Sequence, residues 1–189
     1  MDVSKLIEIM AVAEKLKNNT RHSWTSSNRH ESVAEHSWRL SLMAYLVKDE
    51  FPDVDINKVI LMCICHDLGE AITGDIPAFY KTNTDSKVEY KEVQQLVSNL
   101  PEPYKEDLSQ LFLEMQELKT KESKLCKALD KMETLIQHNE ADLFTWLPLE
   151  YELNLTYGEK EVAFSKYMKE LKQVINEDTK QKIQCSQEQ

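Results

Sequence analysis

The segment Cys65-His66-Asp67-Leu68-Gly69-Glu70 places one imidazole and two carboxylates at the end of a run of seven apolar residues. Burying such polar groups is costly unless they are paired or bind a metal. Imidazole nitrogen and carboxylate oxygen together suit divalent ions such as Mn, Fe, Co, Ni or Zn. A continuous helix would place His66 and Glu70 on one face, and Asp75 follows closely. The alternative is a helix C-terminus with a dipole-stabilised histidine and two solvated acids.

Two residues elsewhere in the chain are candidates to complete such a site. His36 lies within the apolar stripe of an expected helix, so its ring should face the core. A single core histidine is usually only hydrogen-bonded, but two inward-facing histidines on neighbouring helices favour a metal site. Asp130 lies off the main apolar stripe of its helix, on a face of small uncharged residues. Periodicity leaves open whether Asp130 is solvated or packs against the site.

The elements that would position these residues are helices, since the apolar period is helical almost throughout. We expect helices near residues 2–17, 32–50, 55–65, 86–99, 103–119, 121–142 and 159–177, with polar loops at 18–31 and from 74 to about 86. Ser32 and Glu35 form a capping-box pattern at the start of the second helix. The chain is thus predicted to be a single all-α helical bundle over residues 1–178. Its central buried helix would end in the His-Asp pair, and residues 179–189 would form a frayed polar tail.

The composition of the 189 residues excludes several classes of function. With three glycines, the chain has no glycine-rich phosphate loop, and its three arginines, Arg21, Arg29 and Arg39, lie within nineteen residues. The net charge of −10 argues against a nucleic-acid polymer or an anionic membrane as partner. The N-terminus does not resemble a signal peptide, and no apolar run is long enough to span a membrane. The four cysteines form no CxxC pair, and we expect them to be reduced thiols. This favours a location in the reducing cytoplasm.

These motifs together resemble a known family. His36 stands thirty residues before His66-Asp67, and Asp130 stands sixty-three residues after Asp67. This order is similar to the H…HD…D signature of the HD-domain metal-dependent phosphohydrolases. Within them the resemblance is to the 5′-deoxynucleotidases, through the phrases Glu31-Ser32-Val33-Ala34-Glu35-His36, His66-Asp67-Leu68-Gly69-Glu70, Gly74-Asp75-Ile76-Pro77 and Asp130-Lys131-Met132-Glu133. The similarity extends from about residue 6 to 147.

The resemblance implies roles for individual residues. One divalent ion (Mn, Co, Mg, Fe, Ni or Zn) would be held by His36, His66, Asp67 and Asp130. Glu70 and Asp75 would act on the attacking water, and with the carbonyl of Ile76 they are candidates for a second cation. Arg21 would contact the substrate phosphate or sugar, with Trp24 as a further substrate contact. In some bacterial members the tryptophan directly follows the arginine, whereas here the order is Arg21-His22-Ser23-Trp24. The resemblance also implies a homodimer.

The function implied is hydrolysis of deoxyribonucleoside 5′-monophosphates to deoxynucleosides and phosphate. One alternative keeps the metal site but acts on a guanosine polyphosphate or a phosphodiester. Ala71, which follows Glu70, weighs against the polyphosphate hydrolases, which carry an acidic pair there. No histidine lies between Asp67 and Asp130, which argues against a di-iron oxygenase. Another alternative is a catalytically idle, metal-stabilised interaction domain.

Arg39 is expected to form a surface ion pair, and the role of Arg29 stays open.

Overall fold

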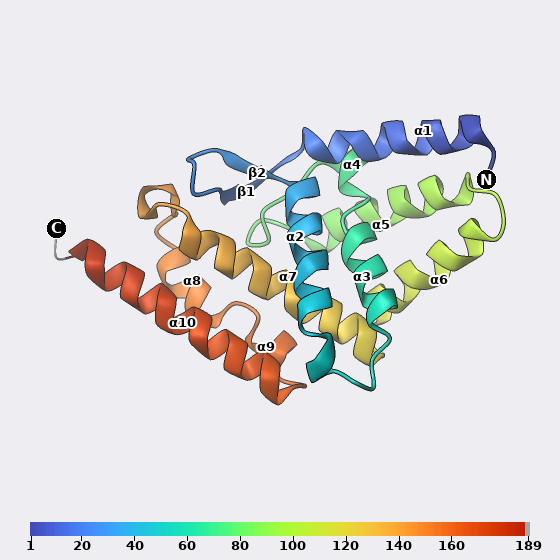
Figure 1. Ribbon diagram of the computed structural model, residues 1–189. Helices are drawn as coiled ribbons and strands as arrows, with labels where there is room; N and C mark the ends of the chain where they lie inside the picture. Colours follow the sequence, from blue (N-terminus) through green and yellow to red (C-terminus); the bar gives the residue numbers. More distant parts are fainter. Residues whose placement is uncertain (188–189) are drawn as a thin grey trace.

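Helices make up most of the computed structural model, which describes residues 1–187 (Figure 1). The α-helices are α1 (Val3–Ala13), α2 (Val33–Leu46), α3 (Ile56–Cys65), α4 (Glu70–Thr73), α5 (Asn83–Ser98), α6 (Tyr104–Glu117), α7 (Lys121–Glu140), α8 (Glu150–Thr156), α9 (Glu159–Val162) and α10 (Lys166–Gln187). Short 3-10 turns lie at Glu14–Lys17, Lys48–Glu50 and Leu143–Thr145. Two antiparallel strands, β1 (Thr20–Trp24) and β2 (His30–Ser32), pair with each other. The prediction of an all-α fold is confirmed.

Helix α7 lies at the centre of the bundle and packs against α2, α3 and α10 (Figure 1). Its apolar stripe includes Leu125, Leu129 and Met132, none of which is exposed to solvent. Helix α3 buries only one face against it. Leu61 and Ile64 on the opposite face of α3 are 42% and 53% exposed, so the prediction of a central buried helix holds for one face of α3 only.

A β-hairpin replaces the loop expected at residues 18–31. The turn closes where Thr25 N–H donates to Arg29 O, with Asn28 at a φ of 60°, a left-handed conformation that asparagine tolerates. Few β-branched residues mark these strands, which is why the pattern indicated a loop. Strand β2 leads directly into α2, whose N-cap Ser32 forms the predicted capping box with Glu35.

The chain bends sharply just after His66. Helix α3 ends at Cys65, and the following backbone bonds are short turns, with Leu68 N–H donating to Cys65 O and Glu70 N–H donating to Asp67 O. Glu70 therefore begins the separate helix α4, and the prediction that His66 and Glu70 share one helix face is wrong. The bend leaves His66 beside Asp67 and Asp130, while Glu70 lines a pocket together with those two aspartates.

The remaining differences are at helix boundaries. Helix α5 begins at Asn83, earlier than predicted, because Thr82 caps it in a box with Asp85. The predicted helix 159–177 is two helices, α9 and α10, and α8 was not predicted. Helix α10 continues to Gln187, and Thr179 is fully buried with its hydroxyl donating to Asn139 Oδ1, so the start of the expected polar tail packs against the domain. Residues 188–189 of that tail lie outside the described residues.

Helix α1 presents most of its apolar residues outward, and only Ile9 and Val12 among them pack against the core within the described residues. It contains no buried residue, and Val3 and Ile7 are 72% and 64% exposed. The apolar spacing therefore predicted the helix correctly but not the side it faces. Within residues 1–187, no helix combines the length and apolar character needed to cross a membrane.

Candidate active site

His36 and His66 are each oriented through one ring nitrogen. His36 Nδ1 donates to the carboxylate of Glu133, and His66 Nδ1 donates to the carbonyl of Cys63 at 2.9 Å. The two rings lie close together, with centroids 5.3 Å apart. Both Nε2 atoms are buried, and neither makes a well-aligned hydrogen bond within residues 1–187. An imidazole with Nδ1–H tied back and Nε2 free is the form that binds metal ions.

Two carboxylates approach the same free nitrogens. Asp67 Oδ2 lies 3.0 Å from His66 Nε2 and 4.0 Å from His36 Nε2. Asp130 Oδ1 lies 3.3 Å from His36 Nε2 and 3.9 Å from His66 Nε2. Ligand atoms bonded at about 2.1 Å to one ion lie roughly 3 to 4 Å apart, so this donor set fits a divalent metal. The structure brings the four predicted ligands together, and that they hold a metal ion stays a prediction.

Asp130 was the residue that periodicity left open, and the structure places it inward. Its side chain is nearly buried, with Oδ2 accepting from Lys127 Nζ at 2.9 Å while Oδ1 faces the histidines. The face of small uncharged residues around Asp130 therefore packs toward the site rather than toward water.

Arg21 connects strand β1 to this cluster. Its Nη1 lies 3.4 Å from Asp67 Oδ2, its Nη2 donates to Thr134 Oγ1 at 3.1 Å, and its Nε lies 3.3 Å from Glu31 Oε2. Burial opposes the charge of this guanidinium, but the surrounding carboxylates, Asp67 first, keep its pKa above the ordinary value. Arg21 is thus a fixed cation beside the predicted metal ligands, which is where a phosphate-binding arginine is needed.

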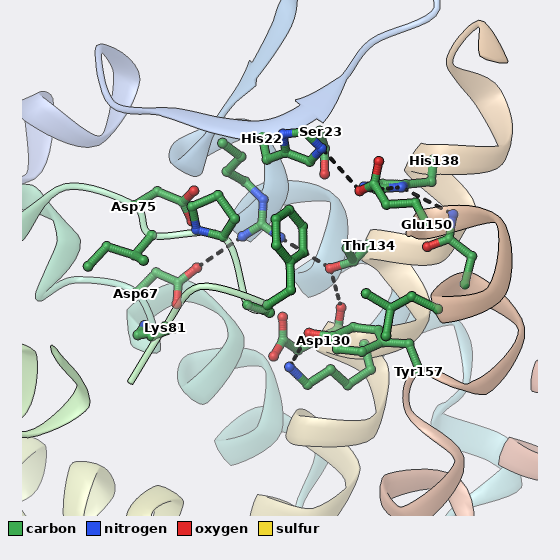
Figure 2. Close-up of a pocket in the computed structure, with 18 of the residues that line it drawn as sticks. His22, Ser23, Asp67, Asp75, Lys81, Asp130, Thr134, His138, Glu150 and Tyr157 are labelled. Carbon is green, nitrogen blue, oxygen red and sulfur yellow. Dashed lines mark hydrogen bonds and ion pairs between the residues drawn. The ribbon is translucent and has the colours of Figure 1, made fainter. Parts of the chain in front are cut away.

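A single pocket gathers most of the predicted site residues (Figure 2). Its lining includes Arg21, Asp67, Glu70, Asp75, Ile76 and Asp130. It also holds three lysines that sequence reasoning missed, Lys81, Lys127 and Lys131. Trp24 is not among the lining residues. Its indole packs at a tilt against the ring of His30, with centroids 4.2 Å apart, and its role in substrate binding stays a prediction.

The two acids predicted to act on water differ in their surroundings. Glu70 is 3% exposed, and burial, together with the charges of Asp67 and Asp75, raises its pKa to about 9. Lys81 Nζ lies 3.6 Å from Glu70 Oε1, which partly offsets that burial. Burial likewise raises the pKa of Asp75. Both carboxyl groups border the pocket beside the cluster of ligands.

A second group of carboxylates lies next to the first. Asp67, Glu70 and Glu89 each offer an oxygen within 4.8 Å of the others, and Lys81 Nζ also contacts Glu89. The resemblance implied Glu70, Asp75 and the Ile76 carbonyl for a second cation; this group contains Glu70 but has Glu89 from α5 instead of the other two. The sequence carries no signal for Glu89, because its approach depends on how α5 packs.

Of the other arginines, Arg39 forms the expected ion pair and Arg29 has no place in the pocket. Arg39 Nη2 lies 2.7 Å from Glu140, and its Nη1 donates to Gln137, which ties α2 to α7. Arg29 pairs with Glu35, the capping residue of α2, at 2.6 Å. Glu133, which orients His36, was also missed, although it stands three residues after Asp130 in one of the motifs.

Comparison with known proteins gives a consistent assignment. The HD domain family model matches residues 13–172. The chain is 30% identical to the 5′-deoxynucleotidase HDDC2 of Bos taurus over 139 residues, covering 71% of this chain and 67% of that protein. It is 27% identical to the 5′-deoxynucleotidase hdd1 of Schizosaccharomyces pombe over 167 residues, covering 77% and 83%.

Solved structures share the fold. A predicted metal-dependent phosphohydrolase from Magnetospirillum magnetotacticum superposes with a TM-score of 0.79 at 24% identity, covering 95% of this chain and 93% of that one. A conserved hypothetical protein from Pyrococcus furiosus has a TM-score of 0.72 at 28% identity, with coverage of 90% and 99%. With the family match over most of its length and the His-Asp cluster in place, this chain belongs to the HD-domain family of metal-dependent phosphohydrolases.

Proposed function

We propose that this chain is a metal-dependent 5′-deoxynucleotidase, hydrolysing deoxyribonucleoside 5′-monophosphates to deoxynucleosides and phosphate. The observation that carries the proposal is that the buried Nε2 atoms of His36 and His66 face Asp67 and Asp130, two carboxylates that line the pocket together with Arg21. The relatives named as 5′-deoxynucleotidases support the substrate class.

His36, His66, Asp67 and Asp130 would hold the divalent ion, which supplies neutralisation and polarisation of the phosphoryl oxygens. The donor set suits Mn, Co, Mg, Fe, Ni or Zn. Asp67 and Asp130, which would coordinate the ion, line the pocket together with the cations Arg21 and Lys127.

The protein's own groups would carry the remaining steps. Arg21 binds two phosphoryl oxygens through its planar guanidinium, which its contacts with Asp67 and Thr134 hold in place. Of Glu70 and Asp75, one accepts a proton from the attacking water and the other protonates the leaving 5′-oxygen. The new bond joins the water oxygen to phosphorus, and the bond from phosphorus to the 5′-oxygen breaks.

A phosphate-release screen tests this function. Nucleoside mono-, di- and cyclic phosphates, together with a guanosine polyphosphate, are compared with Mn, Co, Mg and Zn in turn. We expect release from deoxyribonucleoside 5′-monophosphates above that from ribonucleotides, lost on chelation and restored by one or more of these ions. Faster hydrolysis of the polyphosphate or of a phosphodiester would contradict the proposed substrate.

The variant Glu70→Gln separates catalysis from a purely structural metal site. We expect it to retain its bound metal and its Tm while kcat falls by roughly a hundredfold or more, the range for loss of a general acid or base. Undiminished turnover would contradict the role given to Glu70. Absence of turnover in the metal-loaded wild type would favour the idle interaction domain instead.

We further propose that two copies of the chain associate through the outer faces of α2 and α3, which pack against each other. These faces expose six large apolar side chains: Trp38, Leu42, Tyr45 and Leu46 on α2, and Leu61 and Ile64 on α3. The side chains of Trp38 and Leu46 are 67% and 68% exposed. Grouped exposed apolar residues are typical of protein interfaces. Sedimentation should show a dimer that Trp38→Lys converts to a monomer; a monomeric wild type would contradict this.

A further inference from the structure

Four polar side chains meet at the end of the pocket away from the metal cluster, and the phosphate chemistry does not use them. His22 lies on β1, His138 on α7, and Glu150 and Asn154 on α8. His22 Nε2 lies 3.0 Å from Glu150 Oε1, and His138 Nδ1 lies 3.6 Å from the same oxygen. Asn154 Nδ2 donates to His138 Nδ1 at 3.3 Å. All four line the pocket.

Helix α7 sets the distance between this cluster and the metal ligands. Asp130, Thr134 and His138 stand at intervals of four residues, so they follow one face of the helix. Eight residues of helix rise about 12 Å. Arg21 contacts Thr134 at the middle of that span. Figure 2 shows Thr134 between Asp130 and His138. A substrate whose phosphate lies at the metal and Arg21 therefore extends toward His138 and His22, over the length of a pentose and a base.

The groups around His22 suit a flat, polar-edged ligand. Glu150 is 1% exposed, and its second oxygen accepts the backbone N–H of Leu147 at 2.6 Å, so the carboxylate is satisfied by the protein itself. Because Nε2 of His22 is paired with Glu150, the Nδ1 edge of the His22 ring is the part left for a ligand. Phe79 meets His22 edge-on with ring centroids 5.4 Å apart, and Leu153 and Tyr157 add apolar surface.

A pocket end with apolar walls and a few fixed polar groups is the usual form of a small-molecule recognition site. Glu150 and His138 are buried at this wall, whereas the His22 side chain is 22% exposed and can therefore be reached by a ligand. The buried Lys172 donates to the backbone carbonyl of Asn154 at 2.8 Å and so supports α8 at this point.

We propose that His22, positioned by Glu150, binds the nucleobase of the substrate and is a specificity-determining residue of this pocket. This inference rests on the proposed nucleotidase function and adds to it the group that recognises the base. Glu150 is a positioning residue, because it acts through the ring of His22.

Comparing a deoxyribonucleoside 5′-monophosphate with deoxyribose 5-phosphate tests the proposal, because the two share the phosphate and the sugar and differ in the base. We expect wild type to favour the nucleotide by tenfold or more in kcat/KM. That ratio should fall at least tenfold in His22→Ala and in Glu150→Gln, through a higher KM for the nucleotide with little change in kcat. The control Glu152→Gln, an exposed glutamate on the same helix, should keep the wild-type ratio. Both substrates are assayed with the same protein sample, so a misfolded fraction lowers both rates equally. Partial misfolding therefore does not alter the ratio of the two kcat/KM values.

An equal ratio in wild type and both variants would overturn the proposal while leaving the nucleotidase function intact. Calorimetric titration with deoxyadenosine and thymidine gives a readout that does not depend on catalysis. Wild type should bind at least one of them, and His22→Ala should weaken that binding fivefold or more. Binding that survives in His22→Ala, or no nucleoside binding by wild type, overturns the proposal. Nucleoside binding without any phosphate release would contradict the proposed function alone.

Discussion

Glu133 accepts the Nδ1–H of His36, and neither side chain is exposed to solvent. The two residues are ninety-seven positions apart, and their contact joins α2 to the central helix α7. Such a carboxylate fixes the ring orientation and the tautomer of a histidine and raises its basicity as a ligand. The contact would therefore prepare Nε2 of His36 to bind the proposed metal ion.

Replacing Glu133 by glutamine should weaken metal binding. The amide keeps the shape of the side chain but loses the charge that holds Nδ1–H, and loss of such a partner reduces metal affinity roughly 10- to 100-fold. Competition with a chelator, using Mn or Zn, measures the change. Glu140→Gln is the matched control on the same helix, because Glu140 pairs with Arg39 near the surface. Equal affinities in the two variants would mean that Glu133 does not support the site.

Arg21→Lys should reduce activity while leaving the metal bound. Lysine keeps the positive charge near Asp67 but cannot offer two parallel donors to a phosphate. We expect kcat/KM for a nucleoside monophosphate to fall at least tenfold, which corresponds to about 1.4 kcal/mol of transition-state stabilisation. Arg29→Lys serves as the control, since Arg29 pairs with Glu35 outside the pocket. The idea fails if both variants keep wild-type kcat/KM.

Gly69 is required by the close approach of α5. A Cβ at this position would lie 2.7 Å from Val93 Cγ2 and 2.8 Å from Glu89 Cγ. Gly69→Ala should therefore destabilise the fold by about 1–3 kcal/mol, because the helix must shift. Thermal or urea unfolding measures this loss. In the double variant with Val93→Ala we expect less destabilisation than the sum of the two single changes, and strict additivity would argue against this contact.

The His22–Glu150 pair should make stability depend on pH. The hydrogen bond with Glu150 raises the pKa of His22 above its ordinary 6.5, and Asp75 on the facing loop acts in the same direction. Burial and the neighbouring charges leave His138 on α7 with a pKa lowered to about 4, so it stays neutral above pH 6. Because the pKa of His22 is higher in the folded state than in the unfolded state, its protonation stabilises the fold. This stabilisation is fully present below pH 6.5 and is lost as the pH rises through the pKa of His22 in the folded state.

The loss of Tm caused by Glu150→Gln should accordingly be larger at pH 6 than at pH 9. Thermal unfolding of wild type and variant across that range gives the comparison, with Glu152→Gln as the control. A difference in Tm that is the same at both ends of the range would show that His22 is not charged in the pair.

Local signals in the sequence were sufficient for several features. Ser32 and Glu35 form their capping box within four residues, so no distant contact is needed to predict it. The metal-site candidates His36, His66, Asp67 and Asp130 follow from the spacing of a known motif, and most helices follow from the apolar period. The boundary errors lie where a cap or a bend changes one turn, as in the break between His66 and Glu70.

Only the tertiary structure decided what each helix face meets. Periodicity separates an apolar side from a polar one but does not name the neighbour that covers it. Asp130 turned inward, and the apolar side of α1 turned outward, for this reason. The contacts of His36 with Glu133 and of His22 with Glu150 join residues about a hundred or more positions apart. Such pairs arise from the packing of α2, α7, α8 and the hairpin, and no local pattern in the chain encodes them.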